Sequence, residues 1–135
     1  MLGLWSAYSQ AFLLTLVCVT SIVFALPIFL IPLTWARWFG WRIPQERDLA
    51  IYFGRCLGAF VLIVEALMLR AGLSGEGLVF TFQILLAVAV LMVVVHVWGA
   101  LLRIQPISET LEIGMYSGMF LLAALFYPLH GVAAA

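Results

Sequence analysis

Four ionisable side chains lie inside or at the ends of stretches that are otherwise apolar. Arg55 lies within one apolar run, His96 lies near the end of another, and Glu109 and Glu112 open a third. A charge in the membrane interior costs roughly 2.5–3.5 kcal/mol on insertion scales, so such residues usually face protein or water. Together with Tyr116, one turn beyond Glu112, they are predicted to form a buried polar network.

Counting along the runs places Arg55, His96 and Glu112 at a similar depth. One interpretation is a proton-linked or quinone-headgroup site in which His96 or Glu112 titrates. The other is a structural ion pair, in which Arg55 meets Glu112 or Glu109 and locks the helices together.

Glu65 forms a second intramembrane polar site. It shares a helical face with Gly54 and Gly58, and Gln83 of the next run lies at a similar depth. The carboxylate could hold a cation or a proton. Alternatively, a protonated Glu65 donates a hydrogen bond to Gln83, Thr15 or a backbone carbonyl.

The composition indicates which elements carry these residues. Of 135 residues, 67% are hydrophobic and 9% are charged, whereas a soluble domain has about 25% charged residues. Four apolar runs, at about 11–33, 44–70, 78–102 and 108–127, predict an all-α, polytopic integral membrane four-helix bundle. Short links predict up-down topology within a single transmembrane domain, 1–135. Pro27 and Pro32 predict a kink near Phe24 or an early end of the first helix.

The segment 34–43 alternates tryptophan with arginine, which is typical of a membrane interface. The tryptophan spacing of i, i+3, i+6 suits a short helix lying in the membrane plane. The predicted interface anchors are Trp35, Trp38, Trp41, Arg37 and Arg42.

Arginine counts predict the orientation. Arg37, Arg42, Arg47 and Arg103 lie on one side of the four predicted spans, and Arg70 lies on the other with both termini. The positive-inside rule then places both termini outside. We expect a bacterial inner membrane protein with periplasmic termini.

A G-x-x-x-G spacing, which lets helices approach closely, occurs in the second and fourth runs. The glycines predicted to pack against helices are Gly54, Gly58, Gly114 and Gly118. In the fourth run the glycines lie nearly opposite the glutamates. Whichever face turns inward, the other favours protein over lipid, which predicts an oligomer or a larger complex.

The chain lacks a CxxC motif, a Cys/His metal spacing, and Ser-His-Asp, P-loop and Rossmann patterns. We therefore predict no catalytic residue and no metal site, and no resident cofactor, although a quinone or a lipid could bind. The net charge of zero excludes a nucleic-acid partner.

Five residues carry a resemblance to a known family. A proline-rich end of the first helix, an amphipathic linker and R-x-x-G-A early in the second helix match at Pro27, Pro32, Arg55, Gly58 and Ala59. The region from about 26 to 69 resembles small four-helix DoxX-like membrane proteins. Proteins of that family include membrane subunits associated with quinone-linked sulfur oxidation and many of unassigned role, so the resemblance implies a small membrane subunit, with a link to quinones as one alternative.

Three functions follow from these patterns. The first is a small integral membrane subunit, non-catalytic by itself, that stabilises or helps assemble a larger complex. The second is a quinone-linked membrane redox subunit, and the third is a small oligomeric transporter or channel. The expected partners are membrane lipids and other membrane subunits or copies of this chain.

Overall fold

The computed structural model describes residues 2–129, and the described chain is helical without strands. A 3-10 turn, Ser6–Tyr8, leads into α1, Ser9–Thr20, a π-helical segment, Ser21–Ala25, and α2, Leu26–Leu30. After these come α3, Pro32–Trp38, α4, Asp48–Ser74, α5, Leu78–Leu102, and α6, Ile107–Leu125. Three stretches are long and apolar enough to cross a membrane: Ser6–Leu30, Asp48–Ser74 and Leu78–Leu102. The chain is therefore all-α, with the helices expected of an integral membrane protein.

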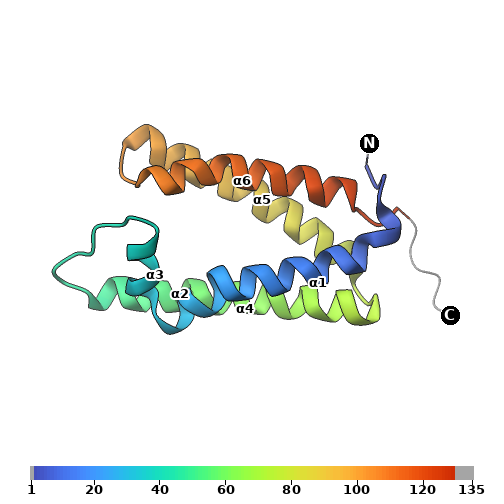
Figure 1. Cartoon of the computed structure of the whole chain (residues 1–135), viewed down its shortest axis with the longest axis horizontal. Coiled ribbons are helices and arrows are strands. Elements are labelled where there is room, and N and C mark those ends of the chain that lie inside the picture. The colour runs from blue at the N-terminus through green and yellow to red at the C-terminus, as the bar shows by residue number, and fades with distance from the viewer. Residues whose placement is uncertain (1, 130–135) are drawn as a thin grey trace.

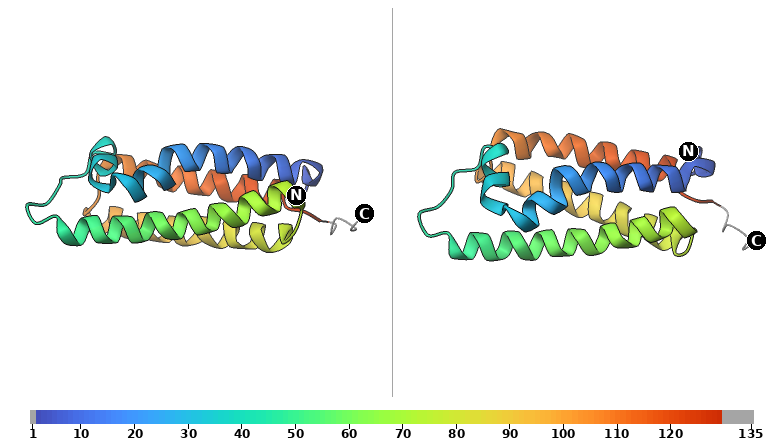
Figure 2. Two further views of the ribbon diagram at one scale, coloured as in Figure 1. Left: turned by 90° about the horizontal axis from the view of Figure 1, so that it is seen from below. Right: turned by 60° about the horizontal axis from the view of Figure 1, so that its bottom comes forward.

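The long helices run side by side in alternating directions (Figures 1 and 2). The α4–α5 connection lies at the same end as the start of α1 and the end of α6, and α3 and the α5–α6 connection lie at the other (Figure 1). Hydrogen bonds from the Gly3 and Trp5 amides to the carbonyls of Ala124 and Leu125, 2.8 and 2.9 Å long, join the start of the chain to the end of α6. The core fills the space between α1, α4, α5 and α6 with Leu13, Val17, Met68, Ala71, Leu78, Phe82, Leu85 and Ala123.

Two prolines divide the first helix. Pro27 has no amide hydrogen and therefore cannot bond to the carbonyl of Val23, four residues before it. The indole N–H of Trp35 donates to that carbonyl instead, at 2.9 Å. The helix ends at Leu30, before Pro32 begins α3. The kink predicted near Phe24 appears as the π-helical segment Ser21–Ala25, whereas the predicted extension to residue 33 is wrong.

The second predicted helix begins later than expected. Residues 39–47 form a loop, and α4 starts at Asp48 rather than at Pro44. Gly40, with φ of 79°, turns the chain out of α3 in a conformation that favours glycine. The loop then extends to the start of α4 (Figure 1). The predicted in-plane helix over 34–43 is correspondingly shorter and lies within α3.

The two glycine pairs lie in different surroundings. A Cβ added to Gly54 would lie 2.6 Å from Cβ of Pro32, and one added to Gly58 would lie 2.6 Å from the backbone nitrogen of Phe29. These glycines let α2 and α3 approach α4 closely. A Cβ added to Gly114 or Gly118 would meet nothing within 4 Å in the described chain. The glycine face of α6 therefore contributes no close packing within the chain.

Candidate functional site

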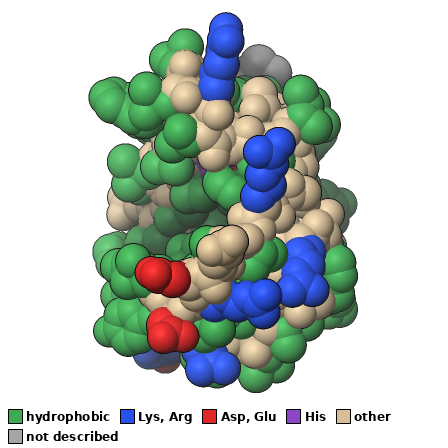
Figure 3. All heavy atoms as spheres, turned by 90° about the vertical axis from the view of Figure 1, so that its left-hand side faces the viewer, with side chains coloured by type: hydrophobic (Ala, Val, Ile, Leu, Met, Phe, Trp, Pro, Cys, Tyr) green, Lys and Arg blue, Asp and Glu red, His purple; other side chains and the backbone are tan. Residues whose placement is uncertain are grey.

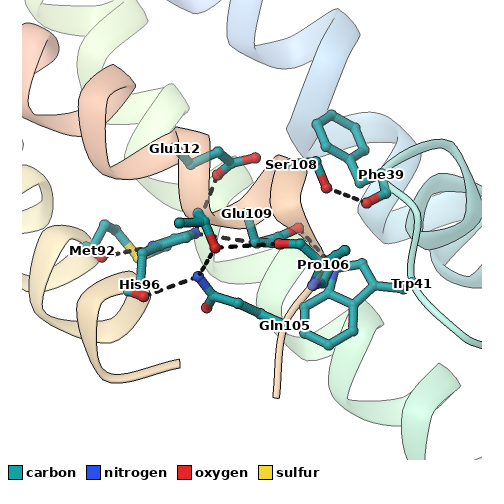
Figure 4. A network of polar contacts seen from close by, with 10 residues as sticks. Phe39, Trp41, Met92, His96, Gln105, Pro106, Ser108, Glu109 and Glu112 are labelled. Atoms are coloured by element: carbon teal, nitrogen blue, oxygen red, sulfur yellow. Dashed lines mark hydrogen bonds and ion pairs between the residues drawn. The ribbon is translucent and has the colours of Figure 1, made fainter. Parts of the chain in front are cut away.

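The structure brings one histidine and two glutamates together between α5 and α6. Nε2 of His96 lies 3.2 Å from Oε2 of Glu109 and 3.3 Å from Oε2 of Glu112. The side chains are 4%, 11% and 10% exposed, respectively. Figure 4 shows that His96 projects from α5 toward both glutamates. We refer to His96, Glu109 and Glu112 as the acid–histidine cluster.

A tight turn between α5 and α6 positions this cluster. Arg103 ends α5 in a left-handed conformation, with φ of 56°. The side-chain amide of Gln105 then donates to the backbone carbonyl of His96 at 3.0 Å and to the hydroxyl of Thr110 at 3.1 Å. Gly99 makes room for this amide, because a Cβ at that position would collide with it. The turn thus fixes the end of α5 against the first turn of α6.

The loop after α3 supplies the next layer of contacts. The indole N–H of Trp41 donates to Oε1 of Glu109 at 2.8 Å, and the hydroxyl of Ser108 donates to the carbonyl of Phe39. Both bonds attach the loop to the start of α6 (Figure 4). Trp41 was predicted to anchor the chain at the membrane interface. Its indole nitrogen faces the acid–histidine cluster, so this tryptophan makes a protein contact that the sequence does not predict.

Tyr116 completes the surroundings of His96. It lies one turn beyond Glu112 on α6, and its ring centroid is 5.2 Å from that of the imidazole. The ring is partly buried. Tyr116 therefore contacts the histidine through its ring, and its place in a polar network stays a prediction.

Arg55 does not join the cluster. Its side chain is exposed on α4, and within residues 2–129 the recorded ion pairs of Glu109 and Glu112 are with His96. Depth along the helices suggested the pairing with Arg55, but α3 and the following loop lie between the start of α4 and the start of α6 (Figure 1). The predicted Arg55–Glu112 or Arg55–Glu109 pair is therefore wrong, and Trp41 takes that place beside Glu109.

Glu65 is buried on α4 but has a different partner from those predicted. The hydroxyl of Ser21 donates to its Oε2 at 2.6 Å, and Glu65 is 5% exposed. Gln83 and Thr15 are both exposed, so the expected hydrogen bonds to Glu65 are corrected. The π-helical segment that begins at Ser21 was not predicted, and its serine was consequently missed as the partner.

The remaining predicted anchors divide into two groups. Trp38, Arg37 and Arg42 are exposed and lie at the end of the molecule that carries most of the arginines. Trp35 is half-buried and stacks on Phe39, with ring centroids 4.5 Å apart. Trp35 therefore stabilises the α2–α3 corner rather than reaching for lipid headgroups.

The cluster contains ligand types that bind metal ions. One nitrogen of His96 and one oxygen from each glutamate all lie within 4.8 Å of one another. The sequence predicts no metal site, because positions 96, 109 and 112 match no standard metal motif. Their proximity depends on the tight turn at 103–106, and that turn, together with the i, i+3 spacing of the glutamates, was the available signal.

Comparison with family models, with curated proteins and with solved structures gave no match.

Proposed function

We propose that this chain is a small integral membrane subunit, non-catalytic by itself, that packs on another membrane protein through α6. The observation that carries the proposal is the outward glycine face of α6. Gly114 and Gly118 meet no other part of the described chain, while Glu109 and Glu112 on the opposite side are buried. A G-x-x-x-G face outside the bundle suits a second transmembrane helix, because the backbones can approach closely there.

The proposal includes α6 as a fourth membrane span. It contains 19 residues, which corresponds to a length of about 28 Å at 1.5 Å per residue, close to the hydrocarbon thickness of a bilayer. Its two glutamates lower its apolar character, but both face His96 rather than lipid. With α6 beside α5, the protein forms an up-down four-helix bundle.

The distribution of arginine supports the proposed orientation. Figure 3 shows the end of the molecule that includes α3 and the α5–α6 turn, where basic side chains gather. The exposed arginines of this half are Arg37, Arg42, Arg47, Arg55 and Arg103. Arg70 lies near the other end of α4, paired with Glu76. The positive-inside rule assigns the arginine-rich end to the cytoplasm and both termini to the periplasm of a bacterial inner membrane.

The composition of the surface supports the membrane assignment. Many large apolar side chains are exposed on every long helix, including Phe60 at 69%, Leu91 at 63% and Leu111 at 71%. A water-soluble protein seldom exposes contiguous apolar surface on this scale. Lipid covers most of it in the proposed arrangement, and a partner helix covers the glycine face.

The two alternative functions place other demands on the fold. A quinone-linked subunit, which the DoxX-like resemblance implies, needs a headgroup site beside a proton-accepting group. A groove of about 450 Å³ lined by Trp5, Tyr8, Phe12 and Phe126 lies at the opposite end of the bundle from the acid–histidine cluster. A transporter would need a polar path that includes both Glu65 and this cluster.

Purification from native membranes tests the proposal. The wild-type chain, extracted in a mild detergent, should carry a stoichiometric membrane protein partner. Gly118→Leu should release that partner while the chain itself stays folded, since a Cβ added at this position meets nothing within 4 Å in the described chain. Phe60→Leu on exposed α4 is the matched control and should retain the partner.

Two results would contradict the subunit proposal. A pure homo-oligomer that Gly118→Leu leaves intact would favour the transporter or channel. A partner retained equally by wild type and Gly118→Leu would mean that α6 is not the contact. A partner with bound quinone, released by Gly118→Leu, would support docking and assign the chain to the redox alternative.

A further inference from the structure

We propose that the acid–histidine cluster is a binding site for a divalent first-row transition metal ion, with His96, Glu109 and Glu112 as the protein ligands and Zn²⁺ as a representative ion. This inference is independent of docking through α6. It rests on the convergence of three ligand atoms, on the hydrogen bond made by the other nitrogen of His96, and on a buried carboxylate oxygen without a partner.

The position of the imidazole proton follows from the backbone. Nδ1 of His96 lies 2.7 Å from the carbonyl oxygen of Met92. A carbonyl oxygen can only accept a hydrogen bond, so Nδ1 carries the proton. In the neutral imidazole, Nε2 then presents a lone pair toward Oε2 of Glu109 and Oε2 of Glu112. Three electron-rich atoms face one another, and a metal cation bound between them would remove their mutual repulsion.

The described part of the chain offers no arginine to this cluster. Within residues 2–129, an arginine–carboxylate ion pair joins Arg70 to Glu76, whereas Glu109 and Glu112 contact Nε2 of His96. When both glutamates are ionised and the imidazole is neutral, the cluster carries a formal charge of −2. A divalent ion offsets both negative charges, whereas a proton on Nε2 offsets one of them, and uncompensated buried charge is costly. The charge of this ligand set therefore fits a divalent metal ion.

The ligand geometry is close to that of a metal centre. Zn–N distances of about 2.0–2.1 Å and Zn–O distances of about 2.0–2.2 Å imply ligand atoms about 3.4 Å apart in a tetrahedral site. The nitrogen–oxygen distances of 3.2 and 3.3 Å agree with this separation, and all three ligand atoms lie within 4.8 Å of one another. Three protein ligands leave a coordination position for water or for another group.

The surroundings of the ligands also match those of metal sites. A metal-binding histidine commonly donates its second N–H to a backbone carbonyl, and metal-binding carboxylates are themselves hydrogen-bonded. Met92 fulfils the first role, and Trp41 fulfils the second toward Glu109. Oε1 of Glu112 is buried without a hydrogen-bond partner. A metal ion that bound both oxygens of Glu112 would satisfy that atom.

Metal binding by the purified full-length chain tests this proposal. The protein is stripped with a chelator in detergent, loaded with Zn²⁺, dialysed and analysed for metal content. We expect a stoichiometric amount of Zn²⁺ and a higher Tm, both reversed by chelator. Co²⁺ loading should give visible absorption bands from a nitrogen and oxygen ligand set. Mg²⁺ should not compete, because it prefers octahedral oxygen ligands and retains its waters.

Variants identify the ligands. His96→Gln, Glu109→Gln and Glu112→Gln should each abolish stoichiometric Zn²⁺ retention. Trp41→Phe should weaken Zn²⁺ binding by about 10–100-fold, as expected for an outer-shell partner. Glu65→Gln removes another buried carboxylate that lies outside the cluster and should leave binding unchanged.

Two outcomes would contradict the metal-site proposal. If the wild-type chain retains no Zn²⁺ or Co²⁺ above the level of the Glu112→Gln variant, the site holds a proton and the proposal is wrong. Equal retention by wild type and all three ligand variants would show adventitious binding elsewhere. Should the variants fail to fold, the Co²⁺ spectrum and the chelator-dependent Tm of the wild-type protein still decide the question.

Discussion

The two halves of the bundle use the same residue types in opposite ways. In the half formed by α1 to α4, Gly54 and Gly58 pack against Pro32 and Phe29, and Glu65 meets a single hydroxyl. In the half formed by α5 and α6, Gly114 and Gly118 of α6 face outward, and two glutamates converge on one histidine. The close helix packing therefore lies in the first half, whereas the second half carries the proposed docking face and the proposed metal site.

Glu65 and Glu112 illustrate the difference most clearly. Each is buried, and each has one oxygen without a hydrogen-bond partner. Glu65 contacts a single hydroxyl donor, whereas Glu112 shares Nε2 of His96 with a second carboxyl group. Burial of a carboxyl group alone therefore does not identify a binding site, and the groups that contact it must be considered.

Removing the histidine should have the largest effect. His96→Leu leaves Glu109 and Glu112 buried beside each other without a cation, which we expect to cost about 3–5 kcal/mol of stability. Thermal unfolding in detergent, followed by size-exclusion chromatography, measures the loss. A loss no greater than that of Ser21→Ala would show that the two carboxyl sites are equivalent.

The loop contact should have the next largest effect. Trp41→Phe keeps the aromatic ring but removes the N–H that donates to Glu109. A hydrogen bond to a charged group contributes about 1.5–3 kcal/mol, and chemical unfolding should reveal a loss in that range. Trp38→Phe, at a side chain that is 65% exposed, is the matched control. Equal losses in the two variants would mean that Trp41 acts only as a surface anchor.

The glycine pairs provide a direct contrast in packing. Gly58→Ala places a methyl group 2.6 Å from the backbone nitrogen of Phe29, and such overpacking costs about 1–3 kcal/mol. Gly118→Ala adds the same methyl group where nothing lies within 4 Å. Thermal unfolding of the purified chain should show a loss for the first and none for the second. The reverse order would overturn the assignment of the inner and outer faces.

The smallest expected effect concerns Glu65. Ser21→Ala removes one hydrogen bond, which contributes about 0.5–1.5 kcal/mol, and it should leave metal retention at the acid–histidine cluster unchanged. Unfolding midpoints and metal analysis of the same sample provide both values. A loss of metal in this variant would show that the Glu65 site and the acid–histidine cluster depend on each other, although they lie in different halves of the bundle.

Several of these features could be predicted from the sequence. The bounds of α5 agree with the predicted 78–102, because an uninterrupted apolar run ends at Arg103 and Pro106. The proximity of His96 to the two glutamates could also be predicted, because a short turn forces adjacent helices to pack side by side in opposite directions. The outward glycine face was one of two arrangements that helical periodicity allowed, and only the fold distinguishes them.

Other features depend on irregular backbone, which periodicity does not encode. The start of α4 and the direction of Trp41 both depend on the loop 39–47. The sequence of such a loop does not show whether its tryptophan faces lipid or protein. The pairing of Arg55 with a glutamate was predicted wrongly because depth along a helix does not show which other segment of the chain lies between two helices. Ser21 was missed because a π-helical segment shifts the helical register on which face assignments depend.

Site-specific photo-crosslinking in native membranes tests the central claim, that α6 faces a partner, most directly. A photoreactive residue at Gly118 should form a discrete crosslink to another membrane protein, while one at Phe60, on the exposed surface of α4, should react with lipid. Crosslinks to lipid alone at both positions, or the same protein crosslink at both, would contradict the account.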